Sequence, residues 1–227
     1  MKKTSRKNIE LGVLFGLVCA IALSFARFEV RCDELRQNVL RLHIIANSDE
    51  PQDQQLKLAV RDAILENSTN VFKNCDNVDD AIATADKNTK IISEIANDVI
   101  KQNGFDYTAA VSVGDRYFDT REYEDFTLPA GTYKSLIVDL GAAEGKNWWC
   151  VVFPCVCVPT ADDANLTDSV SQASAQTAQN APKYEIKFKS VEIYEQFKKI
   201  LLNDSYIKWL HNFMKDKIGR ASCRERV

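Results

Sequence analysis

The spacing of apolar residues predicts one strand and two helices in the first half of the chain. In residues 39–46 (VLRLHIIA), Leu, Leu, Ile and Ala alternate with Arg, His and Ile, which is the period of a half-buried strand. Apolar residues then recur every three or four positions over 56–72, and again over 78–99. That spacing places them on one side of a helix, so both segments are predicted to be amphipathic helices.

Residues 47–52 (NSDEPQ) have the composition of a turn that leads into the first helix. Asp49 is a good N-cap, Pro51 suits the first helical turn, and Gln52 stands where a capping box has Glu or Gln. Gly104 is expected to end the second helix, because glycine tolerates the left-handed conformation found just after a helix.

The middle of the chain changes to the composition of strands, rich in β-branched and aromatic residues. The predicted strands are 108–113, 117–127, 132–140 and 148–158. Gly114-Asp115 and residues 129–131 (PAG) are predicted turns, and Pro154 must lie at a sheet edge or end its strand. One strand, two helices and four strands indicate an α+β fold, with a mostly antiparallel sheet and two helices packed on one face.

Residues 159–182 contain no Lys, Arg or aromatic residue, and Ala, Ser, Thr, Gln, Asn and Asp predominate. Such a segment buries too little apolar surface to fold alone, so it is predicted to be a flexible linker. Beyond it, 183–217 is expected to form a C-terminal strand and helix. Tyr184, Ile186 and Phe188 alternate as in a strand.

Both ends of the chain are expected to lie outside the folded domain of residues 27–158. Residues 1–26 have a basic start and an uncharged run at 11–26, as in an export signal. As a helix this run is about 24 Å long, short for a bilayer core of about 30 Å, so a cleaved signal is favoured over a retained N-terminal anchor. Residues 218–227 (IGRASCRERV) resemble translated sequencing-adapter DNA and receive no functional weight; the natural chain is expected to continue beyond Lys217.

The charge balance argues against nucleic-acid binding. The whole chain of 227 residues has a net charge of −3. Without the two ends, 22 basic and 30 acidic residues remain, a net charge of −8. A nucleic-acid-binding domain is usually strongly basic. Together with the N-terminal segment, the charge balance predicts an acidic, exported and soluble protein.

The residues that could carry chemistry form no convincing active site, and no catalytic residue, metal or cofactor is predicted. Cys150, Cys155 and Cys157 lack the paired spacing of a zinc site. Outside the cytoplasm a disulfide between Cys150 and Cys157 is the better use of these thiols. The alternative is an exported thiol-dependent cell-wall hydrolase, with Cys150 as nucleophile and His43 as base.

Trp148 and Trp149 are adjacent in a predicted strand, so their side chains point to opposite faces. A single core can bury only one of them. The other is either an anchor for a protein partner, because Trp is frequent at the centre of interfaces, or is covered by the linker or the C-terminal helix.

Three sequence runs resemble the stage II sporulation protein R family: RLHIIANSDEPQDQQLK at 41–57 with VRDA at 60–63, LPAGTY at 128–133, and NWWCVVFP at 147–154. Residues 185–188 (EIKF) look like the C-terminal end of the family. The resemblance covers 39–158 and this short piece. It implies an exported signal of endospore-forming Firmicutes, not an enzyme.

According to this resemblance, the protein is made in the forespore and exported into the space between the forespore and mother-cell membranes. There it activates a membrane-embedded aspartic protease, which processes the precursor of the mother-cell factor sigma-E. A ligand of this kind acts only if it binds the active state of the protease better than the inactive one. Apart from the resemblance, the basic and apolar residues of the C-terminal piece, such as those at 208–210 (KWL), leave three options for it: docking on the folded domain, transient association with a membrane, or contact with a partner.

The resemblance also assigns motif positions. These are Arg41, Asn47, Ser48, Asp49, Asp53, Gln54, Lys57, Arg61, Asp62, Pro129, Gly131, Tyr133, Asn147, Trp148, Trp149, Cys150, Phe153, Pro154 and Cys157. For 47–49 and 129–131, helix capping and turn formation are at least as good an explanation as partner contact. Arg61, Asp62, Asn147, Trp148 and Trp149 are the candidates for partner contact.

Overall fold

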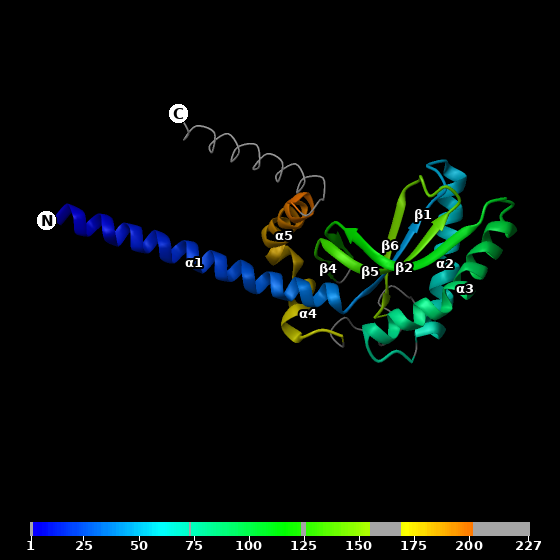
Figure 1. Ribbon diagram of the computed structural model, residues 1–227, viewed down its shortest axis with the longest axis horizontal. Coiled ribbons are helices and arrows are strands. Elements are labelled where there is room, and N and C mark those ends of the chain that lie inside the picture. The colour runs from blue at the N-terminus through cyan, green and yellow to red at the C-terminus, as the bar shows by residue number, and fades with distance from the viewer. Residues whose placement is uncertain (1, 73, 124–125, 155–168, 202–227) are drawn as a thin grey trace, which may run out of the picture.

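The fold is a four-stranded mixed sheet with two helices on one face and a long N-terminal helix that leaves the domain (Figure 1). A computed structural model describes residues 2–72, 74–123, 126–154 and 169–201. The elements are α1 (Lys2–Gln37), β1 (Leu40–Ile45), α2 (Pro51–Phe72), α3 (Val78–Gln102), β2 (Ala109–Phe118), β3 (Arg121–Glu122), β4 (Thr127–Leu128), β5 (Gly131–Leu140), β6 (Asn147–Phe153), α4 (Gln172–Gln179) and α5 (Ala181–Leu201).

The strand order in the sheet is β2-β5-β1-β6. β1 runs parallel to β5 and antiparallel to β6, and β2 runs antiparallel to β5. Two of the three pairings are thus antiparallel, and the predicted α+β class with two helices on one face is confirmed. β6 is an edge strand of this sheet and ends at Phe153, so Pro154 follows the strand as expected.

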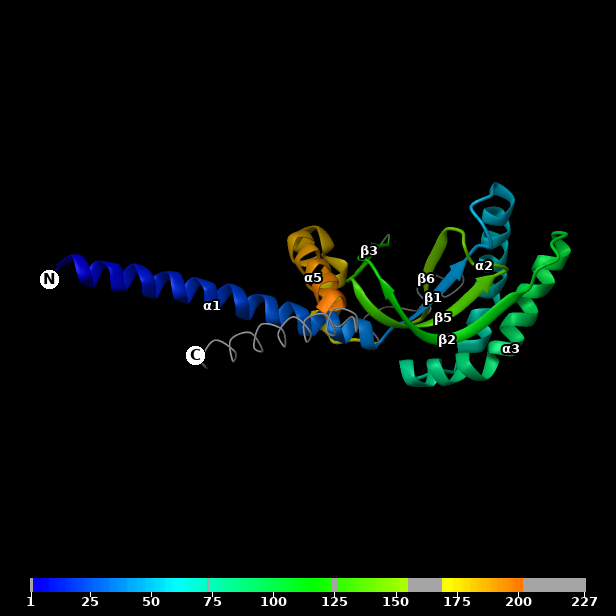
Figure 2. The same ribbon diagram turned by 45° about the horizontal axis from the view of Figure 1, so that its top comes forward.

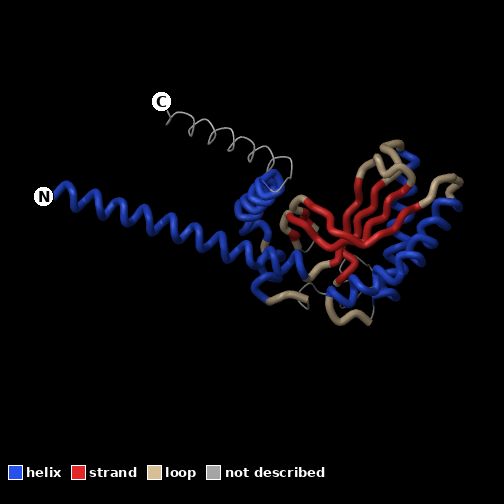
Figure 3. The backbone as a smooth tube through the Cα atoms, viewed as in Figure 1, coloured by secondary structure: helices blue, strands red, loops and turns tan. Residues whose placement is uncertain are grey.

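The main core lies between the sheet and the pair α2 and α3 (Figure 3). Leu42 and Ile44 of β1 point into it and are fully buried, as the alternation of residues 39–46 predicts. Each such side chain contributes about 1.5–3 kcal/mol by leaving water. The N-terminus of α3 is capped by Asn77, whose side chain accepts a hydrogen bond from the Asp80 amide.

A second, smaller core lies on the opposite face of the sheet. Leu35 and Val39, at and just after the end of α1, pack there with Phe118 of β2 and Tyr133 of β5. The short pair β3 and β4 contributes Leu128 to the same cluster. The end of α1 is therefore part of the folded domain.

Helix α1 continues without a break past residue 26, so the expected signal boundary falls inside a helix. Its apolar part is exposed, and the helix is long and apolar enough to cross a membrane, which fits a signal peptide or an anchor. Leu35 is buried in the second core of the domain, and Phe28 and Cys32 are buried against α5. The apolar segment and the folded domain thus share one helix.

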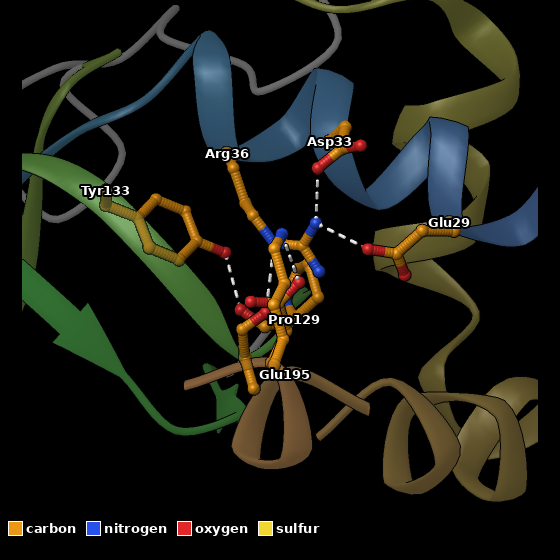
Figure 4. Close-up of polar contacts among 8 residues, drawn as sticks. Glu29, Asp33, Arg36, Pro129, Tyr133 and Glu195 are labelled. Atoms are coloured by element: carbon orange, nitrogen blue, oxygen red, sulfur yellow. Dashed lines mark hydrogen bonds and ion pairs between the residues drawn. The ribbon is translucent and has the colours of Figure 1, made fainter. Parts of the chain in front are cut away.

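Arg36 joins the end of α1 to the turn between β4 and β5 (Figure 4). Its Nε donates to the carbonyl oxygen of Ala130 at 2.9 Å, and its Nη1 forms ion pairs with Glu29 at 2.9 Å and Asp33 at 2.6 Å. Gly131 has a positive φ of 147°, and a side chain there would overlap Arg36. The predicted turn at 129–131 is correct, and its glycine makes room for this contact.

The prediction of a turn at Gly114-Asp115 is wrong. β2 is one ten-residue strand, and Gly114 and Asp115 pair with Ser135 and Lys134 of β5. Long pairing with β5 outweighs the local turn preference of the two residues. The expected strand at 117–127 is also not continuous, because the chain leaves β2 after Phe118 and forms the short strands β3 and β4.

The part of the expected linker that the structure describes, 169–182, is not a flexible coil. It contains α4, which Ser171 caps by accepting from the Ser174 amide. Ser174, Ala175, Thr177 and Ala178 are buried. Small residues allow close helix packing against α1 with little apolar surface, which composition alone does not reveal. Residues 159–168 lie outside the described residues.

The predicted strand at Tyr184–Phe188 is wrong, because these residues belong to α5. Tyr184, Phe188 and Val191 are spaced by four and three positions, and together they pack on Phe28 and Cys32 of α1. The alternation of residues 184–188 is thus the start of a helical pattern. Residues 202–227, including 218–227, lie outside the described residues.

Candidate functional site

Asp53, in the first turn of α2, is the centre of a buried polar network. Ser48 Oγ and Tyr107 OH each donate to its carboxylate at 2.6 Å, and Asn47 Nδ2 donates at 2.8 Å. Burial by itself raises the pKa of Asp53, but these hydrogen bonds together hold the pKa below its usual range. The carboxylate is charged at neutral pH and engaged with three donors, as in a structural anchor.

The loop between β1 and α2, together with Lys57 of α2, holds the connection between β5 and β6 in place. The Ala142 amide donates to Asn47 Oδ1 at 2.9 Å, and Lys57 Nζ donates to the Lys146 carbonyl oxygen at 3.0 Å. Asp49 was the predicted N-cap of α2, and this is wrong: its carboxylate accepts from the Lys146 amide at 2.8 Å. These side chains join two loops that are about a hundred residues apart in sequence.

Gly145 lies where the two loops pack together: its amide donates to the Ala46 carbonyl oxygen at 2.9 Å, and a Cβ there would overlap the Ser48 carbonyl oxygen. We expect Gly145→Ala to lower the free energy of unfolding by about 1–3 kcal/mol, the usual cost of overpacking. Gly114→Ala is the matched control, because a Cβ there makes an ordinary contact with Ile137. Urea denaturation of the two variants checks the prediction, and equal stability of both would contradict it.

Arg41 of β1 is fully buried on the sheet face opposite α2 and α3. Its guanidinium carbon lies 3.8 Å from the ring centre of Phe118 and 4.8 Å from that of Tyr133, and Nη2 donates to Tyr123 OH at 2.8 Å. No carboxylate of the described residues pairs with it. Aromatic rings therefore hold this cation between the sheet and the β3–β4 pair.

Further along this face, His43, Asn147 and Trp149 form an aromatic and polar group. The rings of His43 and Trp149 are stacked, with centroids 6.2 Å apart, and Arg121 lies 3.8 Å above the Trp149 ring. His43 Nε2 lies 2.9 Å from Asn147 Oδ1, an atom that only accepts, so Nε2 carries the proton. Burial lowers the pKa of His43, which keeps the imidazole neutral at pH 7. We call His43, Asn147, Trp149 and Arg121 the Trp149 group.

Arg61, Asp62 and Trp148 form a separate group on the side of the sheet that α2 covers. The Arg61 guanidinium carbon lies 4.4 Å from the Trp148 ring centre, and its Nη2 pairs with Asp62 Oδ1 at 2.6 Å. The five candidate contact residues are thus divided between two faces. The two Trp side chains point to opposite faces, as predicted, and both are half-buried: Trp148 packs against the main core and Trp149 against the second core. We call Arg61, Asp62 and Trp148 the Trp148 group.

Comparison with known proteins gives these groups a context. Residues 36–163, more than half of the chain, match the family model described as Stage II sporulation protein R. The chain belongs to the stage II sporulation protein R family. It is also 36% identical over 118 residues to Stage II sporulation protein R of Bacillus subtilis (strain 168), a match that covers 52% of this chain and 53% of that protein. The chain spans about half the length of this curated relative. No solved structure matches the chain.

The stage II sporulation protein R match contains the polar network around Asp53, the Trp149 group and the Trp148 group. Helices α4 and α5 lie beyond the matched residues. The resemblance of residues 185–188 to the C-terminal end of the family therefore stays a prediction. Many motif positions, such as Asn47, Asp53 and Lys57, hold the two loops together. A structural duty explains these positions without a partner.

The geometry does not support the alternative of a thiol-dependent hydrolase. Cys150 lies in the core beneath α2 and α3, whereas its supposed base His43 lies on the opposite sheet face, beside Trp149. A nucleophile and its base must be within hydrogen-bond reach. Cys157, the predicted disulfide partner of Cys150, lies outside the described residues. Among the described residues, no group of three or more His, Cys, Asp or Glu side chains is arranged to hold a metal ion.

Two residues of these sites were missed in the sequence. Tyr107 follows α3 and reaches Asp53 over a separation of 54 residues, and Arg121 reaches the Trp149 ring from β3. Neither stands in a recognisable motif. Their contacts depend on how α3 and the β3–β4 pair return to the sheet, and local spacing contains no signal of that return.

Proposed function

We propose that this member of the stage II sporulation protein R family is an exported signal. In the space between forespore and mother-cell membranes it activates a membrane-embedded aspartic protease, and this triggers processing of the sigma-E precursor. It acts by binding and not by catalysis. Family membership supports the sporulation role, and the protease, its substrate and the compartment are part of the proposal.

The observation that carries the proposal is the continuity of α1 with a folded domain of this family. The helix passes from an exposed apolar segment into the domain, where Leu35 and Arg36 are buried. When α1 is retained as an anchor, the domain is held next to the membrane, where a membrane-embedded protease is within reach. The same attachment supports action outside the cytoplasm, because the apolar segment fits an export signal or an anchor.

The proposed contact surface is the end of β6 that carries Asn147, Trp148 and Trp149. Asn147 is exposed, and each Trp is half-buried beneath an arginine. The Trp148 and Trp149 groups flank this edge strand from its two sides, so one partner that folds over the strand end contacts both. Half-buried Trp and Arg side chains on a rigid support are typical of interface hot spots.

Reconstitution tests the activator role. The full chain, the protease and the sigma-E precursor of the same organism are co-expressed in a host that does not sporulate. We expect the shorter, processed form of the factor to accumulate only when all three are present, as detected by immunoblot. Equal processing without the chain would refute the proposal.

Substitutions of the two Trp residues, with one control substitution, then separate the candidate surfaces. We expect Trp149→Ala to reduce processing at least fivefold while the circular dichroism spectrum and thermal midpoint show a folded domain, because its ring is one wall of the proposed contact. Ile91→Ala is the control and should leave processing unchanged, because Ile91 is an exposed residue of α3, a helix that packs on β2 at the sheet edge opposite β6. Trp148→Ala shows whether the second side of β6 takes part. Loss of the folded state in Trp149→Ala would instead assign that ring to the core.

A further inference from the structure

Helix α5 has a stripe of exposed apolar side chains. Ile186, Ile193 and Phe197 are 84%, 51% and 61% exposed. They are separated by seven and four positions, so they lie one above another on a single side of the helix. An isolated exposed Ile needs no explanation, but three aligned large side chains on one helix indicate a surface that leaves water.

This stripe is not the side by which α5 packs on the rest of the chain. Phe188 and Val191 face α1 and are buried with Phe28. On a flank of α5, Lys199 lies over the ring of Tyr117 in β2, 4.9 Å from its centre, so that flank faces the sheet. Successive residues of a helix are about 100° apart around its axis, so Phe197 and Lys199 lie on nearly opposite sides of α5. The apolar stripe, which contains Phe197, is therefore on the side opposite Lys199. The stripe therefore points away from the folded domain.

The position of α5 along α1 indicates the level at which the stripe lies relative to the apolar segment. Lys187 Nζ donates to Ser24 Oγ at 3.2 Å, and Tyr194 packs edge-on against Phe25 at 6.1 Å between ring centres. Ser24 and Phe25 belong to the last turn of the uncharged run 11–26. In both views α5 crosses α1 and does not run alongside it (Figures 1 and 2). If α1 spans a bilayer, α5 lies at the level of its surface.

The charges at this level suit an anionic surface. An open hollow of about 360 Å³ between α1 and α5 is lined by Arg27, Arg31 and Lys187, together with Ser24, and has no carboxylate in its lining. Three cations next to the end of an apolar helix are well placed for lipid phosphates, and each basic residue near an anionic surface contributes about 1 kcal/mol. Tyr194, which is exposed, adds an amphipathic ring of the kind that is common at the bilayer boundary.

We propose that α5 is an interfacial helix, which lies on an anionic bilayer surface beside α1. Ile186, Ile193 and Phe197 enter the boundary between headgroups and acyl chains, and Arg27 and Lys187 contact lipid phosphates. With α1 alone, the domain is free to rotate about the helix axis. A second contact removes this freedom and fixes which face of the sheet is turned to the membrane. This membrane site is independent of protease activation.

Photo-crosslinking in vesicles tests the site. The full chain with p-benzoylphenylalanine at Ile193, or at Ile186, is reconstituted in vesicles of phosphatidylglycerol and phosphatidylcholine and irradiated. Both positions are exposed, so the probe leaves the core intact. The control is the probe at Glu185, an exposed position a hundred degrees around the helix from Ile186. We expect at least fivefold more lipid adduct, measured by mass spectrometry, at Ile193 and Ile186 than at Glu185.

The charge contribution is tested in the same assay. Lys187→Glu should at least halve the lipid adduct at Ile193 in vesicles with phosphatidylglycerol and have little effect in phosphatidylcholine alone. An equal yield at Ile193 and Glu185 would overturn the proposal. So would crosslinks from Ile193 to a second copy of the chain in place of lipid, because the stripe would then be a protein interface. An unchanged yield in Lys187→Glu would overturn the role of the lipid phosphates.

Discussion

Replacing Arg36 with alanine is expected to lower the free energy of unfolding of the full chain by about 3–5 kcal/mol, the cost of removing one partner from a buried ion pair. The Arg36 side chain is 6% exposed and that of Glu29 is 17% exposed. Without Arg36, Glu29 keeps a largely buried charge with no cation, and the Ala130 carbonyl oxygen loses its donor (Figure 4). Urea denaturation in detergent, followed by circular dichroism, measures the change.

Arg61→Ala is the matched control for Arg36→Ala. Arg61 also pairs with a carboxylate, Asp62, but that side chain is 60% exposed. Exposed ion pairs contribute only about 0–1 kcal/mol, so this variant should be nearly as stable as the unchanged chain. If Arg36→Ala is no less stable than Arg61→Ala, α1 is not attached to the domain through Arg36. The attachment would then rest on the packing of Leu35 and Val39 in the second core and on the short connection from α1 to β1.

The sequence patterns that predicted the fold correctly are those in which local periodicity and tertiary burial agree. The alternation in residues 39–46 survives because β1 is central in the sheet and must bury Leu42 and Ile44 on one face. The spacing of apolar residues in α2 and α3 is that of helices that cover this same face. In each of these segments the apolar residues that form the periodic pattern are the ones that face the main core.

The predictions that failed are those in which tertiary contacts outweigh local preference. α4 is built from small polar residues that pack closely on α1, so its composition is that of a linker. Gly114 lies within a strand because β5 offers ten positions of pairing. In α5 only the side that faces α1 is buried, and the short alternation at 184–188 concealed the helical period.

The candidate site was predictable only in part. Adjacent Trp residues in a strand must point to opposite faces, and they do. The sequence contains no sign that an arginine covers each ring, because Arg61 and Arg121 come from different elements. It likewise contains no sign that Asp53 binds Tyr107, which lies 54 residues away. Contacts of this kind depend on how the elements pack, and packing is not encoded in local spacing.

Asp53→Asn is expected to have the second large effect, a loss of about 2–3 kcal/mol of stability at pH 7. Hydrogen bonds to a charged acceptor contribute about 1.5–3 kcal/mol, and the substitution removes the charge from an acceptor that holds Ser48, Tyr107 and Asn47. The side-chain NH2 group of the introduced Asn also cannot accept a hydrogen bond, so one of the present donors would face another donor. The β5–β6 connection, which rests on Asn47, should loosen, and faster amide hydrogen exchange at Ala142 would report this.

The contribution of Asp53 to the free energy of unfolding should also decrease at low pH. The folded state lowers the pKa of Asp53, so its charged form stabilises the fold above the pKa of the unfolded chain, about 3.9. That stabilisation is lost as the pH falls through the folded-state pKa. The stability difference between the unchanged chain and Asp53→Asn should therefore stay constant from pH 7 to about pH 5 and shrink below about pH 4. Asp115→Asn, at an exposed carboxylate paired with Lys134, is the control and should show little difference at any pH. A difference for Asp53→Asn that persists undiminished at about pH 2 would show that the shape of the side chain, and not its charge, holds the two loops together.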